Sequence, residues 1–377
     1  MNWKIPLFKI FWDEEDIKSV TEAIKLGMNW AVGSNITKFE KIIAEYIGTK
    51  YCVAFNSGTS ALHAALLAHR IKEGDEVIVP SFTFIATANA PLFVGAKPVF
   101  ADIEEETFGL DPEDVKEKIT EKTKVIIPIH YGGCPCKIKE LKEIAEDNKL
   151  LLIEDAAESL GAKIKNEKVG TFGNSAMFSF CQNKIITTGD GGAIITDSRE
   201  IYEKLRLIRS HGRLETSDYF SSTEYMDYIT LGYNFRMSNI IAALGIAQLK
   251  KIDKAIEMRR EKAEYLTARL KREIKEIIIQ NSPKDYYHVY QMYTIRVNDY
   301  RDELMKYLAS KGIMTKVYFS PTHLTHFYKN ELGYMCKLPV TEEISNQVLS
   351  LPLYPTLTKE EIDHIVEEMK IFFEVVK

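Results

Sequence analysis

Residues 150–155 read Leu-Leu-Leu-Ile-Glu-Asp, an unbroken apolar run that ends in two acids. An apolar run of this length is typical of a strand that is covered on both of its faces. Comparable runs occur at residues 76–79, 124–129 and 192–196. The recurrence of such runs predicts a sheet whose strands are buried between two layers.

Segments with a helical pattern lie between these predicted strands. Residues 57–69 are rich in Ala and Leu, and residues 138–149 carry apolar residues at the spacing of one helix face. Strands that alternate with helices in this way indicate an α/β fold, with a mostly parallel central sheet flanked by helices.

The pattern changes over residues 237–273, which read as almost continuously helical. A helical stretch of this length often joins two lobes. Strand-like and helical segments then alternate to the end of the chain: strands at 287–297 and 314–318, helices at 302–310 and 359–373. We predict a large domain over residues 1–250 and a smaller C-terminal α+β domain over residues 251–377.

The composition excludes several classes of protein. The chain has 377 residues, 45% of them hydrophobic, which is more apolar material than a single core usually needs. A formal net charge of -5 disfavours a nucleic-acid-binding protein, which usually has a basic surface. No run approaches the roughly 18 apolar residues of a membrane span, and residues 1–7 lack the apolar core of a signal peptide. We therefore expect a cytoplasmic protein that binds neither nucleic acid nor a membrane.

The five cysteines are scattered and odd in number, which favours a reducing compartment over a disulfide framework. Cys134 and Cys136 are close enough in sequence to suggest a metal site. The second pair of ligands that a structural zinc site needs is missing at zinc spacing, so no metal is predicted.

Residues 56–62 read Asn-Ser-Gly-Thr-Ser-Ala-Leu and open the helix predicted at 57–69. Gly58 would let the backbone approach a ligand closely. The hydroxyls of Thr59 and Ser60, together with the free N–H groups of the first helical turn, suit a phosphate group. A plain Ser/Thr helix cap would produce the same pattern, so both interpretations stay open at this point.

Residues 153–159 read Ile-Glu-Asp-Ala-Ala-Glu-Ser and lie at the carboxyl end of a predicted strand. Ligands bind at that edge of an open α/β sheet. Asp155 could pair there with a protonated ring nitrogen and hold it charged, as a cofactor that serves as an electron sink requires. A helix-capping aspartate is the alternative.

Residues 175–184 read Ser-Ala-Met-Phe-Ser-Phe-Cys-Gln-Asn-Lys and precede Gly189-Asp190-Gly191-Gly192. A lysine in an apolar, glycine-flanked loop is unusual, because most lysines lie among other charges. A partly buried amine has a lowered pKa and becomes nucleophilic. Ser179 is a further candidate to bind phosphate. With the two preceding segments, Lys184 completes the set that pyridoxal 5'-phosphate requires: a phosphate cradle, a partner for the pyridine nitrogen and a lysine that can form a Schiff base.

The sequence resembles the sugar aminotransferases of the DegT/DnrJ family, a branch of the fold-type-I pyridoxal-phosphate enzymes. The resemblance runs nearly end to end and rests on residues 33–40, 56–62, 80–84, 130–132, 154–161, 178–192, 232–237 and 318–323. It implies a fold-type-I transferase that binds pyridoxal 5'-phosphate.

The resemblance also implies which residues hold the cofactor. Thr59, Ser60 and Ser179 would bind its phosphate, and either Phe82 or Phe84 would stack on its ring.

Four further residues take roles by the same resemblance. Asp155 would pair with the ring nitrogen, and Lys184 would form the Schiff base and shuttle the proton during transfer. Asn234 lies in a loop like the one that reaches the neighbouring subunit's phosphate site, which implies a homodimer with shared active sites. Glu158 departs from the His or Gln that many members carry near the cofactor ring, and resembles branches such as the GDP-perosamine synthases.

The substrate contacts implied by the resemblance are His130, His211, His323 and Tyr318. His130 borders the cofactor segment, and Tyr318 and His323 lie in a segment that lines the sugar site. His211 lies in a loop that is expected near the nucleotide phosphates.

These residues predict an aminotransferase that moves an amino group from L-glutamate to a nucleotide-linked keto-sugar, with a 4-keto-6-deoxyhexose as first choice. Two alternatives stay open. One is a dehydratase that uses the same cofactor on the sugar, although those enzymes replace the lysine with histidine. The other is a non-catalytic regulatory protein with the same fold. The sequence leaves the sugar, the carbon that is aminated and the nucleotide base open.

Overall fold

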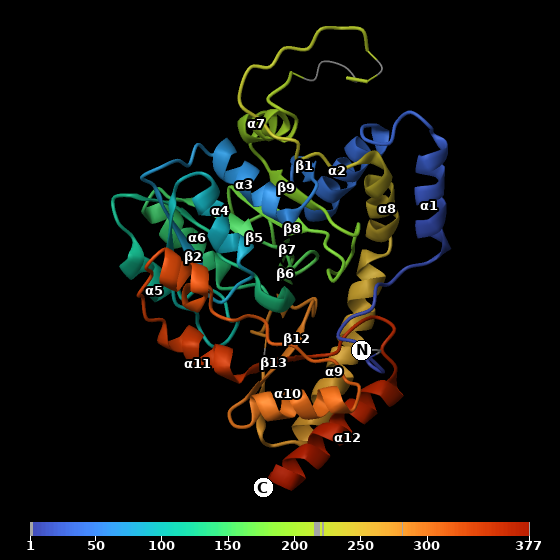
Figure 1. The fold of residues 1–377 in the computed structure, drawn as a ribbon, viewed down its shortest axis with the longest axis vertical. Coiled ribbons are helices and arrows are strands. Elements are labelled where there is room, and N and C mark those ends of the chain that lie inside the picture. Colours follow the sequence, from blue (N-terminus) through green and yellow to red (C-terminus); the bar gives the residue numbers. More distant parts are fainter. Residues whose placement is uncertain (1–2, 215–218, 221, 281, 377) are drawn as a thin grey trace.

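A sheet of seven strands, in the order β1-β9-β8-β5-β4-β2-β3, forms the centre of the larger domain within the described part of the chain. The computed structural model describes residues 3–214, 219–220, 222–280 and 282–376 (Figure 1). In sheet order the strands are β1 (Tyr51–Phe55), β9 (Gly192–Thr196), β8 (Ser175–Ser179), β5 (Leu151–Asp155), β4 (Thr123–Ile126), β2 (Glu76–Pro80) and β3 (Lys97–Ala101).

The sheet is mostly parallel. Strands β3, β2, β4, β5 and β8 pair in parallel, in that spatial order. Strand β9 runs antiparallel to both of its neighbours, β1 and β8. The predicted α/β fold with a mostly parallel central sheet is thereby confirmed, and the opening run at residues 150–155 is the strand β5 near its middle.

Helices cover both faces of this sheet. In β1, Val53 and Phe55 pack on one side with α3 and α7, whereas Cys52 and Ala54 pack on the other with α2 and α8. This two-sided burial explains why the strands are apolar without alternation. The helices of the larger domain are α1 (Glu14–Lys25), α2 (Ser34–Ile47), α3 (Gly58–Ala68), α4 (Ala86–Phe93), α5 (Pro112–Lys118), α6 (Ile138–Asp147), α7 (Arg199–Arg209) and α8 (Asn239–Leu249).

Helix α3 is buried on nearly every side. It lies between the sheet and the helices α4 and α7. Its sequence carries no Asp, Glu, Lys or Arg, which suits a helix that presents no face to water. Ser57 is its N-cap, because the Ser57 Oγ accepts a hydrogen bond from the Ser60 N–H at 3.1 Å. The helix predicted at 57–69 is therefore confirmed.

The C-terminal domain is built on the antiparallel sheet β10-β12-β13. Its core gathers apolar side chains from these strands and from the helices α9, α10 and α12. The elements of this domain are β10 (Ile277–Ile279), β12 (Tyr293–Val297), β13 (Val348–Leu351), α9 (Ile252–Glu273), α10 (Arg301–Ser310), α11 (Pro339–Gln347) and α12 (Lys359–Val376).

The start of the chain packs with this C-terminal domain. The Ile5 N–H donates to the Gly312 carbonyl at 3.0 Å, and the Leu353 N–H donates to the Leu7 carbonyl at 3.2 Å. Ile5 also belongs to the C-terminal core. The large domain predicted over residues 1–250 includes this segment, whereas the contacts of residues 5–7 lie with the C-terminal domain. Ile5 is buried against a segment that is distant in the sequence, and no local sequence pattern predicts this contact.

The helical stretch predicted over residues 237–273 is two helices, α8 and α9, which break at Lys250 and Lys251. Helix α9 joins the two domains, because Ile256 packs in the core of the large domain and Leu266 packs in the C-terminal core.

Two strand predictions need correction. Residues 314–318 form no strand, since only Lys316 makes a bridge, to Ser350. The run predicted at 287–297 is divided between β12 and the short strand β11 (Tyr286–Tyr287), which pairs with β6 (Lys163–Ile164) of another sheet.

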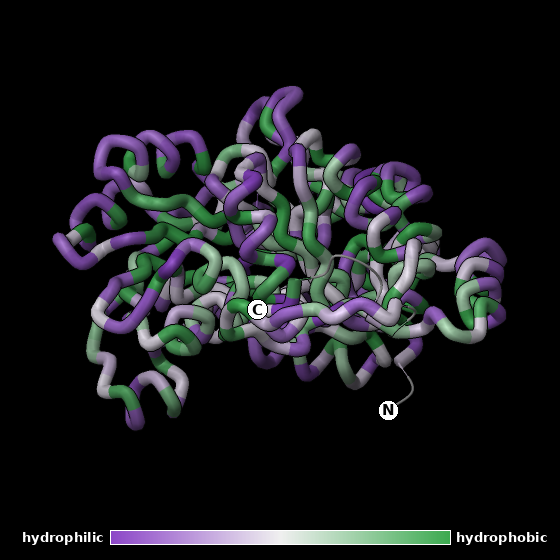
Figure 2. Tube along the Cα trace, turned by 90° about the horizontal axis from the view of Figure 1, so that it is seen from above, coloured by the Kyte–Doolittle hydropathy of each residue, from purple (hydrophilic) through white to green (hydrophobic). Residues whose placement is uncertain are grey.

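The hydropathy of the chain follows this arrangement. Figure 2 shows hydrophobic segments gathered along the interior strands, while the outer loops and helices are largely hydrophilic. No helix in the described ranges is both long enough and apolar enough to cross a bilayer.

Candidate active site

Lys184 lies in the loop that connects β8 to β9. The loop is closed at its base, where the Phe180 N–H donates to the Gly191 carbonyl at 2.9 Å. The Lys184 side chain is only 14% exposed, and its Nζ lies 3.4 Å from Glu158 Oε1. The other carboxylate oxygen of Glu158 accepts the Gly132 N–H at 2.9 Å. The two residues singled out in separate segments of the sequence therefore form one buried ion pair.

The proposed phosphate cradle is assembled by strand register. Phe55 of β1 and Ser179 of β8 both lie opposite Gly192 of β9, so the three strand ends are side by side. A Cβ atom on Gly58 would lie 3.2 Å from the Ser179 Cβ, and one on Gly192 would lie 2.5 Å from the Ser57 carbonyl oxygen. Glycine at these two positions lets the N-terminus of α3 approach Ser179, and the N–H groups there suit an anion.

The hydroxyls of the cradle are not equally available. Ser60 Oγ lies 2.6 Å from Asn56 Oδ1 and 3.0 Å from the Ser57 carbonyl oxygen, so it already takes part in the cap of α3. Thr59 is half-buried beside it. Of the two interpretations left open in the sequence, the cap is present at this helix N-terminus, and the phosphate cradle stays a prediction that the cap does not exclude.

Asp155 is buried at the carboxyl end of β5. Its Oδ2 accepts a hydrogen bond from Thr87 Oγ1 at 2.6 Å, and its Oδ1 accepts the Ala157 N–H at 3.2 Å. Burial raises the pKa of Asp155, while the bonds from Thr87 and Ala157 oppose this rise. A carboxylate that has lost its water gains most from a cationic partner, which is what a protonated pyridine nitrogen provides.

The two phenylalanines predicted to stack on the cofactor differ in exposure. Phe82 is fully buried, stacked on Tyr131 with ring centroids 5.0 Å apart and touching the edge of Phe108. Phe84 is 59% exposed and lies beside Phe319. Core packing encloses the ring of Phe82, whereas the ring of Phe84 is open, and stacking of either ring on the cofactor stays a prediction.

His130 and His323 are closed off by their own neighbours. His130 is fully buried, with Nε2 3.1 Å from Glu154 Oε2 and Nδ1 accepting the Cys136 N–H at 3.1 Å. In His323, Nδ1 lies 2.6 Å from Ser81 Oγ and Nε2 lies 3.4 Å from a Glu342 oxygen.

Both ring nitrogens of each histidine thus have protein partners, and substrate contact by His130 and His323 stays a prediction. Glu154 is itself fully buried and also accepts the N–H groups of Gly170, Phe172 and Gly173.

Tyr318 and His211 remain candidates for the substrate side. Tyr318 is half-buried. Burial raises the pKa of its phenol and the nearby Glu158 carboxylate adds to this, whereas a hydrogen bond with Asn183 opposes it. The C-terminal domain thus brings an aromatic residue to the Lys184 loop. His211 is exposed, in a left-handed backbone conformation with φ of 62°, and its N–H donates to the Tyr233 carbonyl at 2.9 Å.

Asn234 is exposed. Its backbone forms an isolated bridge with Ser210. Its carbonyl accepts a hydrogen bond at 3.5 Å from the side-chain Nδ2 of Asn56, which lies just before the proposed phosphate cradle. Its side chain is therefore presented on a segment that borders the cradle of its own chain.

Two contributors to the site were missed in the sequence. Thr87 holds Asp155 from the first turn of α4, and a threonine between the apolar residues Ala86 and Ala88 is the signal that could have pointed to it. Gly132 holds Glu158 through its backbone N–H, for which no sequence signal exists. No group of three or more His, Cys, Asp or Glu side chains in the part of the chain that the structure describes is arranged to hold a metal.

Comparison with known proteins gives a consistent result. The model of the DegT/DnrJ/EryC1/StrS aminotransferase family matches residues 11–370. The chain is 36% identical to the GDP-perosamine synthase of Escherichia coli O157:H7, over 98% of both chains. It is 37% identical to a pleiotropic regulatory protein of Geobacillus stearothermophilus, over 95% of this chain and 94% of that one. Among solved structures, the PLP form of the putative sugar aminotransferase Spr1654 from Streptococcus pneumoniae superimposes with a TM-score of 0.91 at 26% identity, covering 100% of this chain and 99% of that one.

Proposed function

The chain belongs to the DegT/DnrJ/EryC1/StrS aminotransferase family and is a pyridoxal-phosphate-dependent sugar aminotransferase, and from this premise we propose that it aminates a nucleotide-linked keto-sugar with L-glutamate as donor. A 4-keto-6-deoxyhexose is the first candidate for the sugar. The GDP-linked form is the first to test, because a GDP-perosamine synthase is 36% identical and Glu158 resembles that branch.

The observation that carries the proposal is the convergence of three groups around one loop. The buried pair of Lys184 and Glu158, the buried Asp155, and the cradle at Gly58 and Ser179 come from separate segments of the sequence. When bound, pyridoxal phosphate supplies an electron sink that stabilises negative charge on the carbon that loses a proton.

The chain's own residues then divide the remaining tasks. With the cofactor bound, the Lys184 Nζ would serve as acid and base, because a free amine can take up a proton and return it. Glu158, 3.4 Å away, holds the ammonium form in place. Asp155 would keep the ring nitrogen charged, and Phe84 would cover the ring. The first turn of α3, with Thr59, Ser60 and Ser179, binds the phosphate.

We further propose a homodimer in which Asn234 completes the phosphate site of the neighbouring subunit. The support is its exposure on a segment that borders its own cradle. An Asn234→Ala variant should bind pyridoxal phosphate more weakly. In a mixture with Lys184→Ala chains it should regain activity, because one of the two mixed sites would then have both residues.

The decisive experiment follows the visible absorbance of protein loaded with pyridoxal phosphate. We expect a yellow band that borohydride bleaches and that Lys184→Ala abolishes. L-Glutamate should discharge the band, and a GDP-linked 4-keto-6-deoxyhexose should restore it. Absence of the band in loaded protein would refute the role of Lys184. A band that responds to glutamate but to none of a panel of keto-sugars would refute the sugar assignment alone.

The same experiment separates the two alternatives. A dehydratase would consume the sugar without glutamate, and the lysine at position 184 argues against it. A regulatory function has one observation in its favour, namely the similarity to the regulatory protein of G. stearothermophilus. Glutamate-dependent turnover of a sugar would exclude a purely non-catalytic role. A cytoplasmic location remains our prediction and is in keeping with five free cysteines.

A further inference from the structure

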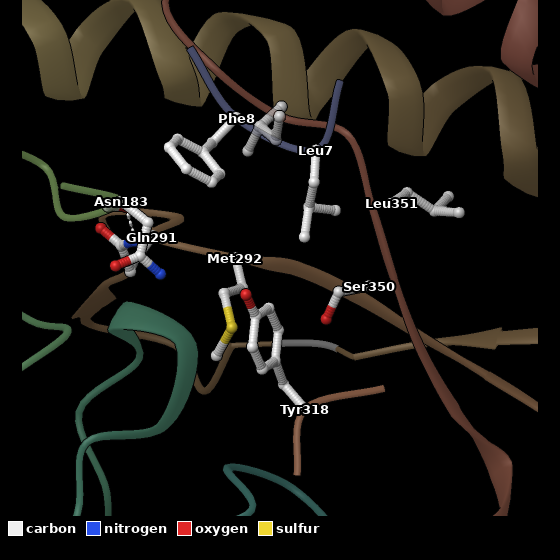
Figure 3. Close-up of a pocket in the computed structure, with 9 residues that line it drawn as sticks. Leu7, Phe8, Asn183, Gln291, Met292, Tyr318, Ser350 and Leu351 are labelled. Carbon is white, nitrogen blue, oxygen red and sulfur yellow. Dashed lines mark hydrogen bonds between the residues drawn. The ribbon is translucent and has the colours of Figure 1, made fainter. Parts of the chain in front are cut away.

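Gln291, from the C-terminal domain, forms a hydrogen bond to the loop that carries Lys184. Its amide Nε2 donates to the carbonyl oxygen of Asn183, which belongs to the peptide group that joins Asn183 to Lys184 (Figure 3). We propose that Gln291 is a positioning residue, which sets where the Lys184 amine lies and thereby makes the C-terminal domain part of the catalytic apparatus. This inference rests on the role of Lys184 proposed above.

The segment that carries Gln291 is held rigidly from behind. Arg259, on the joining helix α9, is buried and donates to the carbonyls of Tyr290 at 3.1 Å, Gln291 at 3.4 Å and Leu353 at 3.0 Å. One guanidinium thus ties α9, the entry to β12 and the segment that follows β13 into a single unit. A side chain anchored on such a unit is a stable reference point for a loop.

The same segment also reaches the other member of the buried ion pair. The Met292 N–H donates to the Gly132 carbonyl at 3.1 Å, and the Gly132 N–H in turn donates to Glu158. At Gly133, with φ of 95°, a Cβ atom would lie 2.9 Å from the Gln291 nitrogen and 3.1 Å from the Glu158 carbonyl oxygen, so a side chain there would part the two segments. Residues 289–292 therefore contact both sides of the Lys184–Glu158 pair.

The amide of Gln291 is not explained by packing alone. Its side chain is 6% exposed, and no donor reaches its Oε1 within the described ranges. Burying an amide with one unsatisfied atom costs free energy that an apolar side chain of the same size would not cost. The orientation is set, because the Asn183 carbonyl can only accept and so faces the nitrogen. The bond to Asn183 is therefore the contribution that an apolar residue could not make.

The test removes the donor and keeps the shape. Gln291→Met retains the length of the side chain and loses the N–H. Gln280→Met is the matched control, since Gln280 also donates its amide to a backbone carbonyl, that of Glu106 at 3.4 Å. Both proteins would be compared with the wild type in the pH titration of the visible band, in the single-turnover rate with L-glutamate and in the rate at which cofactor-free protein forms the band. Thermal unfolding would check that each variant folds.

We expect Gln291→Met to keep the visible band but to change the pH at which the absorbance of that band titrates, because the Lys184 nitrogen is held less firmly. The single-turnover rate should fall by about ten-fold, since small displacements of a reacting group cost one to two orders of magnitude. The rate at which cofactor-free protein forms the band on addition of pyridoxal phosphate should also fall. Gln280→Met should match the wild type in all three.

A Gln291→Met protein that forms the band with wild-type titration and rates would overturn this inference and leave the proposed function intact. Wild-type protein without a band would instead defeat the proposed function itself. If Gln291→Met does not fold, Gln291→Leu serves the same comparison. Failure of both to fold would overturn the proposal, because Gln291 would then be a structural residue.

Discussion

Replacement of Asp155 by Asn should have opposite effects on the cofactor-free and the loaded protein. The asparagine keeps the size of the side chain and can still accept the Ala157 N–H, while Thr87 can turn its hydroxyl to Thr83, 2.8 Å away. The geometry of the strand end is therefore preserved, and the change removes only a negative charge.

In the loaded enzyme this charge would face a cationic ring nitrogen in a buried site. Removing one partner of a buried ion pair costs about 3–5 kcal/mol. At about 1.4 kcal/mol for each factor of ten, the rate constant should fall by about two to three and a half orders of magnitude. The assay is single-turnover reaction with L-glutamate, monitored by the visible band at saturating cofactor, with the exposed Asp147→Asn as control.

In the cofactor-free protein, the same substitution should increase stability. Burial raises the pKa of Asp155 above its ordinary value of 3.8, so the folded state disfavours the ionised carboxyl. The protonated carboxyl therefore contributes stability at a pH below its ordinary pKa. This contribution is lost as the pH rises through the higher pKa that Asp155 has in the folded protein. At neutral pH, Asp155→Asn should therefore raise the melting temperature of the cofactor-free protein, and the gain should vanish in acid. A variant that reacts within about two-fold of the wild type, or that melts lower than the wild type without cofactor at neutral pH, would refute this reasoning.

Three further predictions concern single side chains. Phe82→Ala should destabilise the fold by about 3–5 kcal/mol. Phe84→Ala should leave the melting temperature unchanged and weaken pyridoxal-phosphate binding, as equilibrium dialysis would measure. Weak binding by a stable Phe82→Ala protein would identify Phe82 as the stacking residue instead. Gly192→Ala should lower cofactor affinity strongly, because its Cβ would lie 2.5 Å from the Ser57 carbonyl oxygen and force the α3 N-terminus away from Ser179; unchanged affinity would show that the cradle tolerates this displacement. Burial lowers the pKa of His288 to about 3, so stability should be full above about pH 6.5 and fall as the pH drops toward 3, and a His288→Phe variant should show a shallower decline in thermal melts across that range.

The sequence determined the fold class and most of the candidate site. Its apolar runs are long enough to be buried on both faces, and in a parallel sheet the carboxyl ends of such strands meet at one edge. That rule brings Asp155, Ser179 and the start of α3 together without any knowledge of side-chain packing. Lys184 could be singled out because most lysines lie on a solvated surface among other charges, whereas this one lies in an apolar loop.

Only the tertiary structure decided which partners these residues have. The sequence pattern marks a residue as apolar or polar, but whether the ring of Phe82 is enclosed depends on Tyr131, which approaches from the short helical turn at residues 131–133. The burial of His130 depends in the same way on Glu154.

The bond from Gln291 to the Asn183 carbonyl joins residues 108 positions apart through a backbone atom that every amino acid carries. Such a contact depends on how the two domains pack, so the local sequence of neither segment predicts it. The sequence therefore indicated where the candidate site lies, and the packing of the C-terminal domain against the Lys184 loop decided which side chain contacts the peptide group before Lys184.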